Sequence, residues 1–458
     1  MNNRIKDMDT PICDFVRRYQ ARDTVRMHMP GHKGVPLTGT EPADITEIAG
    51  ADVLYRSRGI IRRSEENAAA LFGAARTVYS AEGSSLCIRA MLYLASLRAA
   101  ERGLPKRLLA GRNAHKTMIT AAAMLDLDID WIFPAPEEGL LSCRIDPETV
   151  DGVLARSQYM AVYVTSPDYT GHMADIRGIA AVCRRRNVPL LVDNAHGAYL
   201  KFLPEDLHPL TLGADMTCDS AHKTLACLTG AAYLHISREA PAEWAETAEQ
   251  AMDFFASTSP SWLILASLDR MNAELAGSWS GELADTVRRV RMLAEKLRAD
   301  GWDTAGNEPM KLTIMPRSRG YTGDRLAEML RAEGIECEFS DPDYTVLMPS
   351  PRTWDKDWER LARAAEGIGP GEALKDVPPA VPAPEKACSV REAMLAPRET
   401  VPAGEAIGRI MADPDAGCPP AVPILIPGER ISPEAVACFR YYGKDECTVV
   451  RNPGSAES

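Results

Sequence analysis

The chain has 458 residues, of which 45% are apolar and 25% charged, and its formal net charge is −12. This size and composition predict a globular protein of two or three domains. The acidic balance argues against non-specific nucleic-acid binding and against docking on an anionic membrane surface, and no apolar stretch approaches the length of a membrane span. Eleven cysteines without a Cys-x-x-Cys pair, and an N-terminus without an apolar region, favour reduced thiols and a cytoplasmic protein.

The first segment with a chemical signature is Ala81–Ser85, directly before a helix expected at 84–100. Gly83 allows close backbone approach, and the Ser84 and Ser85 hydroxyls at a helix start suit a phosphate. The alternative is a plain serine cap of the helix. A strand is expected next at 107–110, followed by a helix at 114–125 that carries Ala-His-Lys-Thr near its start.

The middle of the chain reads as a β-α-β unit. Apolar runs at 160–164 and 188–192 flank a segment of helical composition at 175–186. Such a unit predicts a mostly parallel sheet covered on both faces, with ligands bound beyond the carboxyl ends of its strands. Asp193 and Lys223 both follow short apolar runs and are expected at those strand ends.

A buried acid and a lysine at neighbouring strand ends suit pyridoxal phosphate. The Lys223 amine would form a Schiff base with the cofactor aldehyde, and the Asp193 carboxylate would keep the pyridine nitrogen protonated. The alternative is two ordinary polar residues at strand ends. The Ala81–Ser85 segment upstream favours the cofactor site.

Ala-His-Lys-Thr occurs twice, at 114–117 and at 221–224, so two lysines are candidates for the Schiff base with the cofactor. Lys223 lies one strand beyond Asp193 and has Ser220 three residues before it, whereas Lys116 falls in a helix's first turn, where it would be solvated. His196 and His222 are candidates for proton transfer or for holding the phosphate, and His115 for stacking on the ring. A zinc site from Asp193, His196 and His222 is the rival reading, but it leaves Lys223 without a role, and we expect no metal.

Further strands and helices are expected towards the C-terminus: a strand at 230–236, helices at 262–275 and 283–299, strands at 311–314 and 345–348, and helices at 324–333 and 354–366. A change in the pattern of strand-like and helix-like segments near residue 305 predicts a second, smaller α/β domain. Residues 377–384 form a stiff proline-rich connector, and 419–428 is an extended stretch.

Taken in order, these motifs resemble the bacterial Orn/Lys/Arg decarboxylase family, pyridoxal phosphate enzymes of fold type I. The resemblance rests on segments spread through most of the chain: Met27–Gly34, Ile45–Glu47, Glu82–Ser85, Arg112–Lys116, Thr165–Gly171, Ser220–Leu225, Ser257–Ser261, Ala266–Asp269, Arg391–Ala393 and Ile424–Glu429. The chain is similar to the short form of the family, which lacks the N-terminal wing domain.

The resemblance implies an aspartate aminotransferase-like large domain with a mostly parallel sheet, plus a smaller α/β C-terminal domain. We expect an N-terminal segment (1–45), the cofactor-binding domain (46–305), a small α/β domain (306–370), a connector (371–388) and a decarboxylase-type subdomain (389–458). The implied activity is decarboxylation of lysine, arginine or ornithine in a homodimer or larger oligomer with shared sites. The resemblance implies that the catalytic residues are Lys223, Asp193, His196 and His222. The residues implied to bind the cofactor are Gly83, Ser84, Ser85, His115, Asp193, His196, Ser220, His222, Lys223, Ser257 and Thr258. Of these, Ser257 and Thr258 are implied to reach the site of a neighbouring subunit.

The chain departs from the family at two places. Asn194 stands where the family has Glu, and the loop 52–59 carries Tyr, Ser and two arginines where the family has His and Pro. If that loop lined the pocket, Arg56 and Arg58 would disfavour a cationic substrate. An aminotransferase or lyase with Arg352 or Arg391 on the substrate carboxylate, and a catalytically silent paralogue, are therefore the alternatives.

Overall fold

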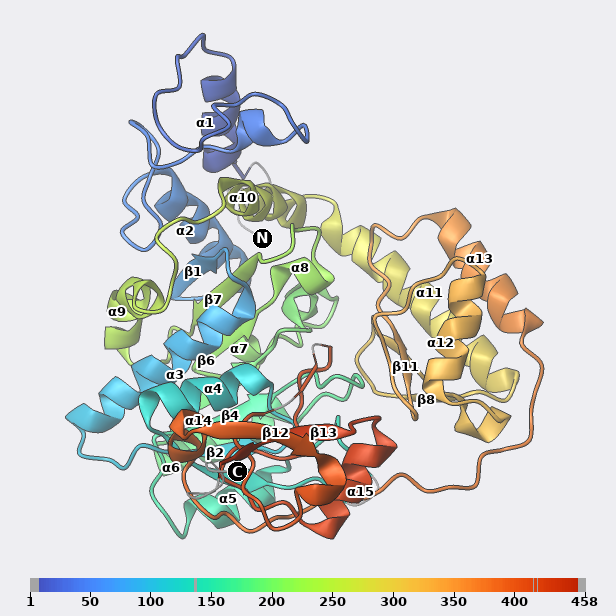
Figure 1. Cartoon of the computed structure of the whole chain (residues 1–458). Helices are drawn as coiled ribbons and strands as arrows, with labels where there is room; N and C mark the ends of the chain where they lie inside the picture. The colour runs from blue at the N-terminus through green and yellow to red at the C-terminus, as the bar shows by residue number, and fades with distance from the viewer. Residues whose placement is uncertain (1–7, 136–137, 415, 418, 452–458) are drawn as a thin grey trace. The chain divides into compact units, whose positions relative to one another are not determined.

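A computed structural model describes residues 8–135, 138–414, 416–417 and 419–451. The chain divides into two compact units: unit 1 comprises Met1–Arg98 and Ile176–Ala284, and unit 2 comprises Ala99–Asp175 and Asp285–Ser458. Both are α/β, as predicted, and Figure 1 shows the helices and strands of each. Within the described residues, no helix is long and apolar enough to cross a membrane.

Unit 1 is built on four strands in the order β1-β7-β6-β5. These are β1 (Arg76–Ser80), β7 (Ala232–Ile236), β6 (Met216–Asp219) and β5 (Leu190–Asp193), and every residue in them is buried. The pair β5–β6 is parallel, whereas β7 is antiparallel to both of its neighbours. Because β5 and β6 run the same way, Asp193 and Asp219 end their strands at the same edge of the sheet.

The helices of unit 1 surround these strands, and their ends follow local chemistry. α2 ends at Gly73 in the left-handed region with φ +76°, as a glycine readily does. The strand expected at 188–192 begins only at Leu190, because Pro189 has no N–H to donate to a ladder. The helices are α1 (Pro11–Gln20), α2 (Ile60–Phe72), α3 (Gly83–Glu101, whose last residues belong to unit 2), α6 (Ile176–Arg186), α7 (Pro209–Leu212), α8 (Ala221–Thr224), α9 (Ala242–Asp253) and α10 (Trp262–Ala276).

Unit 2 contains three kinds of sheet. β2 (Arg107–Gly111) lies between β4 (Ala161–Thr165) and β3 (Asp128–Ile132), all parallel. A four-stranded antiparallel sheet has the order β10 (Phe339–Ser340), β11 (Thr345–Leu347), β9 (Leu312–Met315) and β8 (Asp303–Ala305). β12 (Arg398–Pro402) pairs with β13 (Glu446–Val450). The helices are α4 (Lys116–Leu125), α5 (Pro147–Leu154), α11 (Trp279–Ala299, which begins in unit 1), α12 (Gly323–Ala332), α13 (Asp355–Gly367), α14 (Val390–Leu395) and α15 (Pro433–Tyr441).

Two apolar cores stabilise the C-terminal half. α11, α12 and α13 pack with the four-stranded sheet around Trp302 and Leu312. A separate cluster around Phe439 and Val449 holds β12–β13 and α15. The proline-rich residues 377–384 form neither helix nor strand, and 419–428 contains turns rather than a strand.

Candidate active site in unit 1

The turn between β1 and α3 leaves room at the start of a long helix. Gly83 has φ +71° and donates its N–H to the Gly230 carbonyl oxygen at 2.7 Å. The Ser80 hydroxyl donates to the Gly83 carbonyl at 2.8 Å and accepts the Glu82 N–H at 3.0 Å, which fixes the turn. A side-chain carbon added at Gly83 would meet no atom of the described residues within 4 Å. A ligand can therefore approach this backbone closely, at a helix end whose field favours an anion.

Two of the predicted phosphate-binding serines lie together. Ser220 is the N-cap residue of α8, yet its side chain does not cap the helix. Instead its hydroxyl donates to the Ser84 hydroxyl at 2.9 Å. The starts of α3 and α8, 136 residues apart in the chain, thus present hydroxyls to one place.

Asp193 ends β5 with only 3% of its surface exposed. Its Oδ1 accepts the Ala195 N–H at 3.1 Å and the Cys218 thiol at 3.4 Å. Cys218 is the partner of Asp193 in the β5–β6 register, so the sheet itself places the thiol there. Burial raises the pKa of Cys218 well above its ordinary value, with Asp193 adding to the effect. The thiol therefore stays protonated and remains a donor.

Lys223 and His196 are direct neighbours: the Lys223 Nζ lies 2.9 Å from the His196 Nε2. His196 is buried and belongs to the loop after β5, whereas Lys223 is half-buried in α8. The His222 ring turns elsewhere, with Nδ1 2.9 Å from the Ala231 carbonyl oxygen. Because a carbonyl only accepts, this nitrogen of His222 carries a proton.

Behind Asp193 lies a polar cluster with fully buried members that the sequence did not reveal. The His208 Nε2 lies 2.7 Å from the Asp219 Oδ2 and 3.1 Å from the Asn194 Nδ2. The His208 Nδ1 accepts the Leu210 N–H, so its Nε2 carries the proton and donates to Asp219. His235, whose Nε2 lies 3.8 Å from the Asp219 Oδ2, has its pKa lowered to about 3 by burial and is neutral. Asn194, the departure from the family pattern, is thus part of this buried network.

Among the described residues, the His208, Asp219 and His235 side chains lie close enough to hold a metal ion together. His208 instead acts as a donor to Asp219, and His235 places its Nδ1 2.8 Å from the Thr77 hydroxyl. These contacts join His208, Asp219 and His235 to the ends of β5 and β6 in one hydrogen-bond network.

The other predicted site residues fall in different settings. His115 belongs to unit 2, where its Nδ1 accepts the Thr117 N–H and caps α4. This cap explains why α4 begins at Lys116 rather than at 114. The Lys116 Nζ donates to the Ala416 carbonyl oxygen at 2.9 Å. Ser257 and Thr258 are exposed in unit 1, and the Ser257 N–H donates to the Glu82 carboxylate at 2.8 Å.

The arginines that raised doubt about the substrate have other surroundings. Arg56 is exposed and lies 3.5 Å from the Asp253 carboxylate, and Arg58 is exposed as well. Arg391 donates to the Ala123 and Met124 carbonyl oxygens at the end of α4, whereas Arg352 is exposed. Arg56 and Arg391 thus already have partners within their own units.

Comparisons with known proteins identify the family of the chain. Residues 10–303 match the model of the Orn/Lys/Arg decarboxylase major domain, and residues 371–457 match that of the family's C-terminal domain. The chain is 30% identical to an arginine decarboxylase of Halalkalibacterium halodurans, over 94% of this chain and 93% of that protein. It is 29% identical to an arginine decarboxylase of Bacillus subtilis, over 94% of this chain and 92% of that protein.

Solved structures show the same fold. The lysine decarboxylase of Francisella novicida superposes with a TM-score of 0.78 at 18% identity, covering 97% of this chain and 79% of that one. The constitutive lysine decarboxylase of E. coli gives 0.77 at 18% identity, covering 97% and 82%. The predicted fold class, fold type I, is confirmed. With two family models matching most of its length, the chain belongs to the Orn/Lys/Arg decarboxylase family.

Proposed function

We propose that the chain is a pyridoxal phosphate-dependent decarboxylase of a basic amino acid, with Lys223 as the residue that holds the cofactor aldehyde. The observation that carries the proposal is the 2.9 Å approach of Lys223 to His196 beside the end of the strand that carries Asp193. The residues fit the cofactor: Gly83 leaves open space at a helix start, and the Ser84 and Ser220 hydroxyls lie beside it.

Pyridoxal phosphate, when bound, supplies a ring that withdraws electrons from the bond to the departing carboxylate. Asp193 places a carboxylate in a buried setting, where its charge would act strongly on a protonated ring nitrogen. Cys218 and the Ala195 N–H hold one oxygen of that carboxylate in position. The serines and the helix start bind the phosphate and orient the ring.

His196 is the proposed proton carrier. It lies against the Lys223 amine, and a hydrogen bond joins Nζ to Nε2. A group that gives a proton to the substrate's central carbon after loss of CO2 has to be held at this distance scale from the reacting atoms. His222, tied to Ala231, is the second candidate.

The substrate is proposed to carry a cationic side chain. The two relatives described above are named arginine decarboxylases, and they align over nearly the whole chain. Arg56 pairs with Asp253 on the surface of unit 1, which weakens the case that the loop 52–59 repels a cation. Arginine is therefore the first substrate to test, followed by lysine and ornithine.

The test is a CO2-release screen over arginine, lysine, ornithine and a set of uncharged and acidic amino acids. Wild type should release CO2 from one of the basic three, and Lys223→Ala should release none. Lys116→Ala is the matched control, because it lies in the second copy of the same tetrapeptide, and should keep most of the activity. Keto acid in place of CO2 would indicate an aminotransferase, and protein that never takes up the cofactor would indicate a silent paralogue.

We also infer a homodimer or larger oligomer in which Ser257 and Thr258 reach a neighbour's site. In support, both residues are exposed and follow Phe254, a residue that is 66% exposed. Light scattering of the holoenzyme should give at least twice the 50.0 kDa of the chain. A monomer with full activity would contradict this inference.

A further inference from the structure

The loop between residues 52 and 59 places an unusual tyrosine beside the candidate site. Tyr55 has φ +66°, in the left-handed region that a non-glycine residue rarely adopts. Its side chain is nonetheless 95% buried, with 5% of the residue exposed. A strained backbone that delivers a side chain into the interior has to be held there by its surroundings.

The first of two clamps on this loop is Asp52. Its carboxylate accepts backbone N–H groups from both ends of the loop and from the start of α2, at 2.7–3.3 Å (Val53, Arg58, Gly59, Ile61 and Arg62). It replaces the missing side-chain cap at Gly59, the N-cap residue of α2. Asp52 thereby closes the loop on itself with Tyr55 inside it.

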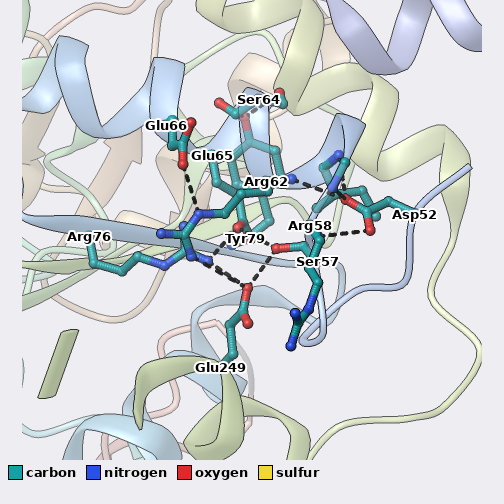
Figure 2. Close-up of polar contacts among 12 residues, drawn as sticks. Asp52, Ser57, Arg58, Arg62, Ser64, Glu65, Glu66, Arg76, Tyr79 and Glu249 are labelled. Carbon is teal, nitrogen blue, oxygen red and sulfur yellow. Dashed lines mark hydrogen bonds and ion pairs between the residues drawn. The ribbon is translucent and has the colours of Figure 1, made fainter. Parts of the chain in front are cut away.

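The second clamp is Ser57, shown in Figure 2. The Ser57 hydroxyl lies 2.6 Å from the Glu249 carboxylate and 3.2 Å from the Glu65 carboxylate, both of which also accept from the Arg76 guanidinium. Glu65 is fully buried and Arg76 nearly so. This network ties the loop to α2, β1 and α9.

The Tyr55 hydroxyl is buried and makes no hydrogen bond of normal geometry within the described residues. Its polar surroundings include Ser80 and Glu82, which belong to the turn that leads into Gly83 and α3. Burial raises the pKa of Tyr55 well above its ordinary value, so the phenol keeps its proton and acts as a donor. Its contact with the Ser80 hydroxyl falls short of normal hydrogen-bond geometry, and an acceptor supplied by a ligand would satisfy this buried donor more fully.

We propose that the Tyr55 hydroxyl is a further cofactor-binding group, which donates a hydrogen bond to the phosphate held at the β1–α3 turn. The inference rests on the proposed function, because it takes pyridoxal phosphate as the ligand. It assigns a binding role to a loop that differs from the family pattern. The two clamps hold Tyr55 in place, and the open space at Gly83 leaves room for the phosphate.

The experiment compares the affinity of the apoenzyme for pyridoxal phosphate and for pyridoxal, which lacks the phosphate, by absorbance titration. Tyr55→Phe removes one oxygen and keeps the ring, so folding is preserved and checked by thermal unfolding of the apoprotein. The variant should bind pyridoxal phosphate about ten- to one-hundredfold more weakly, as for loss of a hydrogen bond to a charged group. Its affinity for pyridoxal should not change.

Tyr233→Phe is the matched control, because the Tyr233 hydroxyl in β7 is also buried and makes no hydrogen bond of normal geometry to the part of the chain that the structure describes. It should leave both affinities as in wild type. Equal weakening of both ligands in Tyr55→Phe, or no weakening of either, would overturn the assignment of Tyr55 while leaving the proposed function intact. Wild type that fails to bind pyridoxal phosphate at all would instead overturn the proposed function.

Discussion

The Lys223 amine and the His196 ring lie 2.9 Å apart, although 27 residues separate them in the chain. The contact follows from the sheet: β5 and β6 are parallel neighbours, and each residue comes shortly after the end of its strand. A lysine that is to give up an aldehyde to an incoming amine would need a nearby group that can take or give a proton. His196 is the group in that position within unit 1.

We therefore predict that His196→Gln slows decarboxylation by about a hundredfold or more, the range expected for loss of a general acid–base group. Glutamine keeps a polar side chain but cannot exchange a proton near neutral pH. The cofactor content of the purified protein, read from its absorbance, should stay close to that of wild type. If the rate falls only in proportion to lost cofactor, His196 serves binding rather than proton transfer.

Asp52 should contribute to stability through the start of α2. Its carboxylate accepts five N–H groups, and Asp52→Ala leaves them without that acceptor. Loss of a helix cap costs about 1–2 kcal/mol, and chemical denaturation of the apoprotein measures it. Asp52→Asn keeps one acceptor oxygen and should lose less. Equal stability of wild type and Asp52→Ala would show that solvent replaces these bonds without cost.

The stability of the protein should depend on pH through Glu65. Burial raises its pKa to about 7 from an ordinary value of 4.5, against the opposing effect of Arg76. The folded state thus holds a proton that the unfolded state releases between these values. The stability that this proton gives is full below about pH 4.5 and is lost as the pH rises to about 7.

Glu65→Gln should flatten that part of the stability curve, by an amount on the order of 3 kcal/mol from the size of the shift. Denaturant unfolding of the apoprotein at pH 5 and pH 8 measures the difference. Asp269 and Asp341, with pKa values raised by burial to about 6 and about 7, change stability in the same direction and leave a residual slope. An unchanged slope in Glu65→Gln would mean that Glu65 is already ionised at pH 5.

The parts of the site that the sequence predicted are those with a local signature. Gly83 and Ser84 lie at the start of a long helix and Asp193 ends β5, and both places could be inferred from the local sequence. Lys223 was expected at a strand end but lies in α8, beyond the end of β6. Cys218 could not, because its contact with Asp193 depends on which residues the β5–β6 register sets side by side. The histidine network around Asp219 was missed for the same reason.

The loop 52–59 shows a different limit. Its arginines drew attention because charge is visible in a sequence, yet both are exposed. The informative residue is Tyr55, whose burial depends on an irregular backbone and on two clamps of distant origin. Ser57 contacts Glu249, 192 residues away, and no periodic pattern encodes such a contact.

In unit 2, a buried ion pair joins the segment before α4 to the C-terminal motif. The Arg112 guanidinium donates to the Glu429 carboxylate at 2.7 Å and to the Ile424 carbonyl at 3.1 Å, and it lies over the Trp131 ring. The Arg112 and Glu429 side chains are 2% and 7% exposed. Burial lowers the pKa of Arg112 and raises that of Glu429, so each charge depends on the other.

Removing one partner of such a pair strands a buried charge, which costs about 3–5 kcal/mol, whereas replacing both by apolar groups is far milder. We therefore expect Arg112→Met and Glu429→Met each to destabilise the protein strongly, and the double variant to be more stable than the sum of the two effects predicts. A double-mutant cycle from denaturant unfolding gives the coupling energy. Additive losses in stability would mean that water reaches the ion pair. The segments 112–116 and 424–429 would then be joined by backbone contacts rather than by charge. One such contact nearby is the hydrogen bond from the Lys116 N–H to the Ala421 carbonyl oxygen at 2.8 Å.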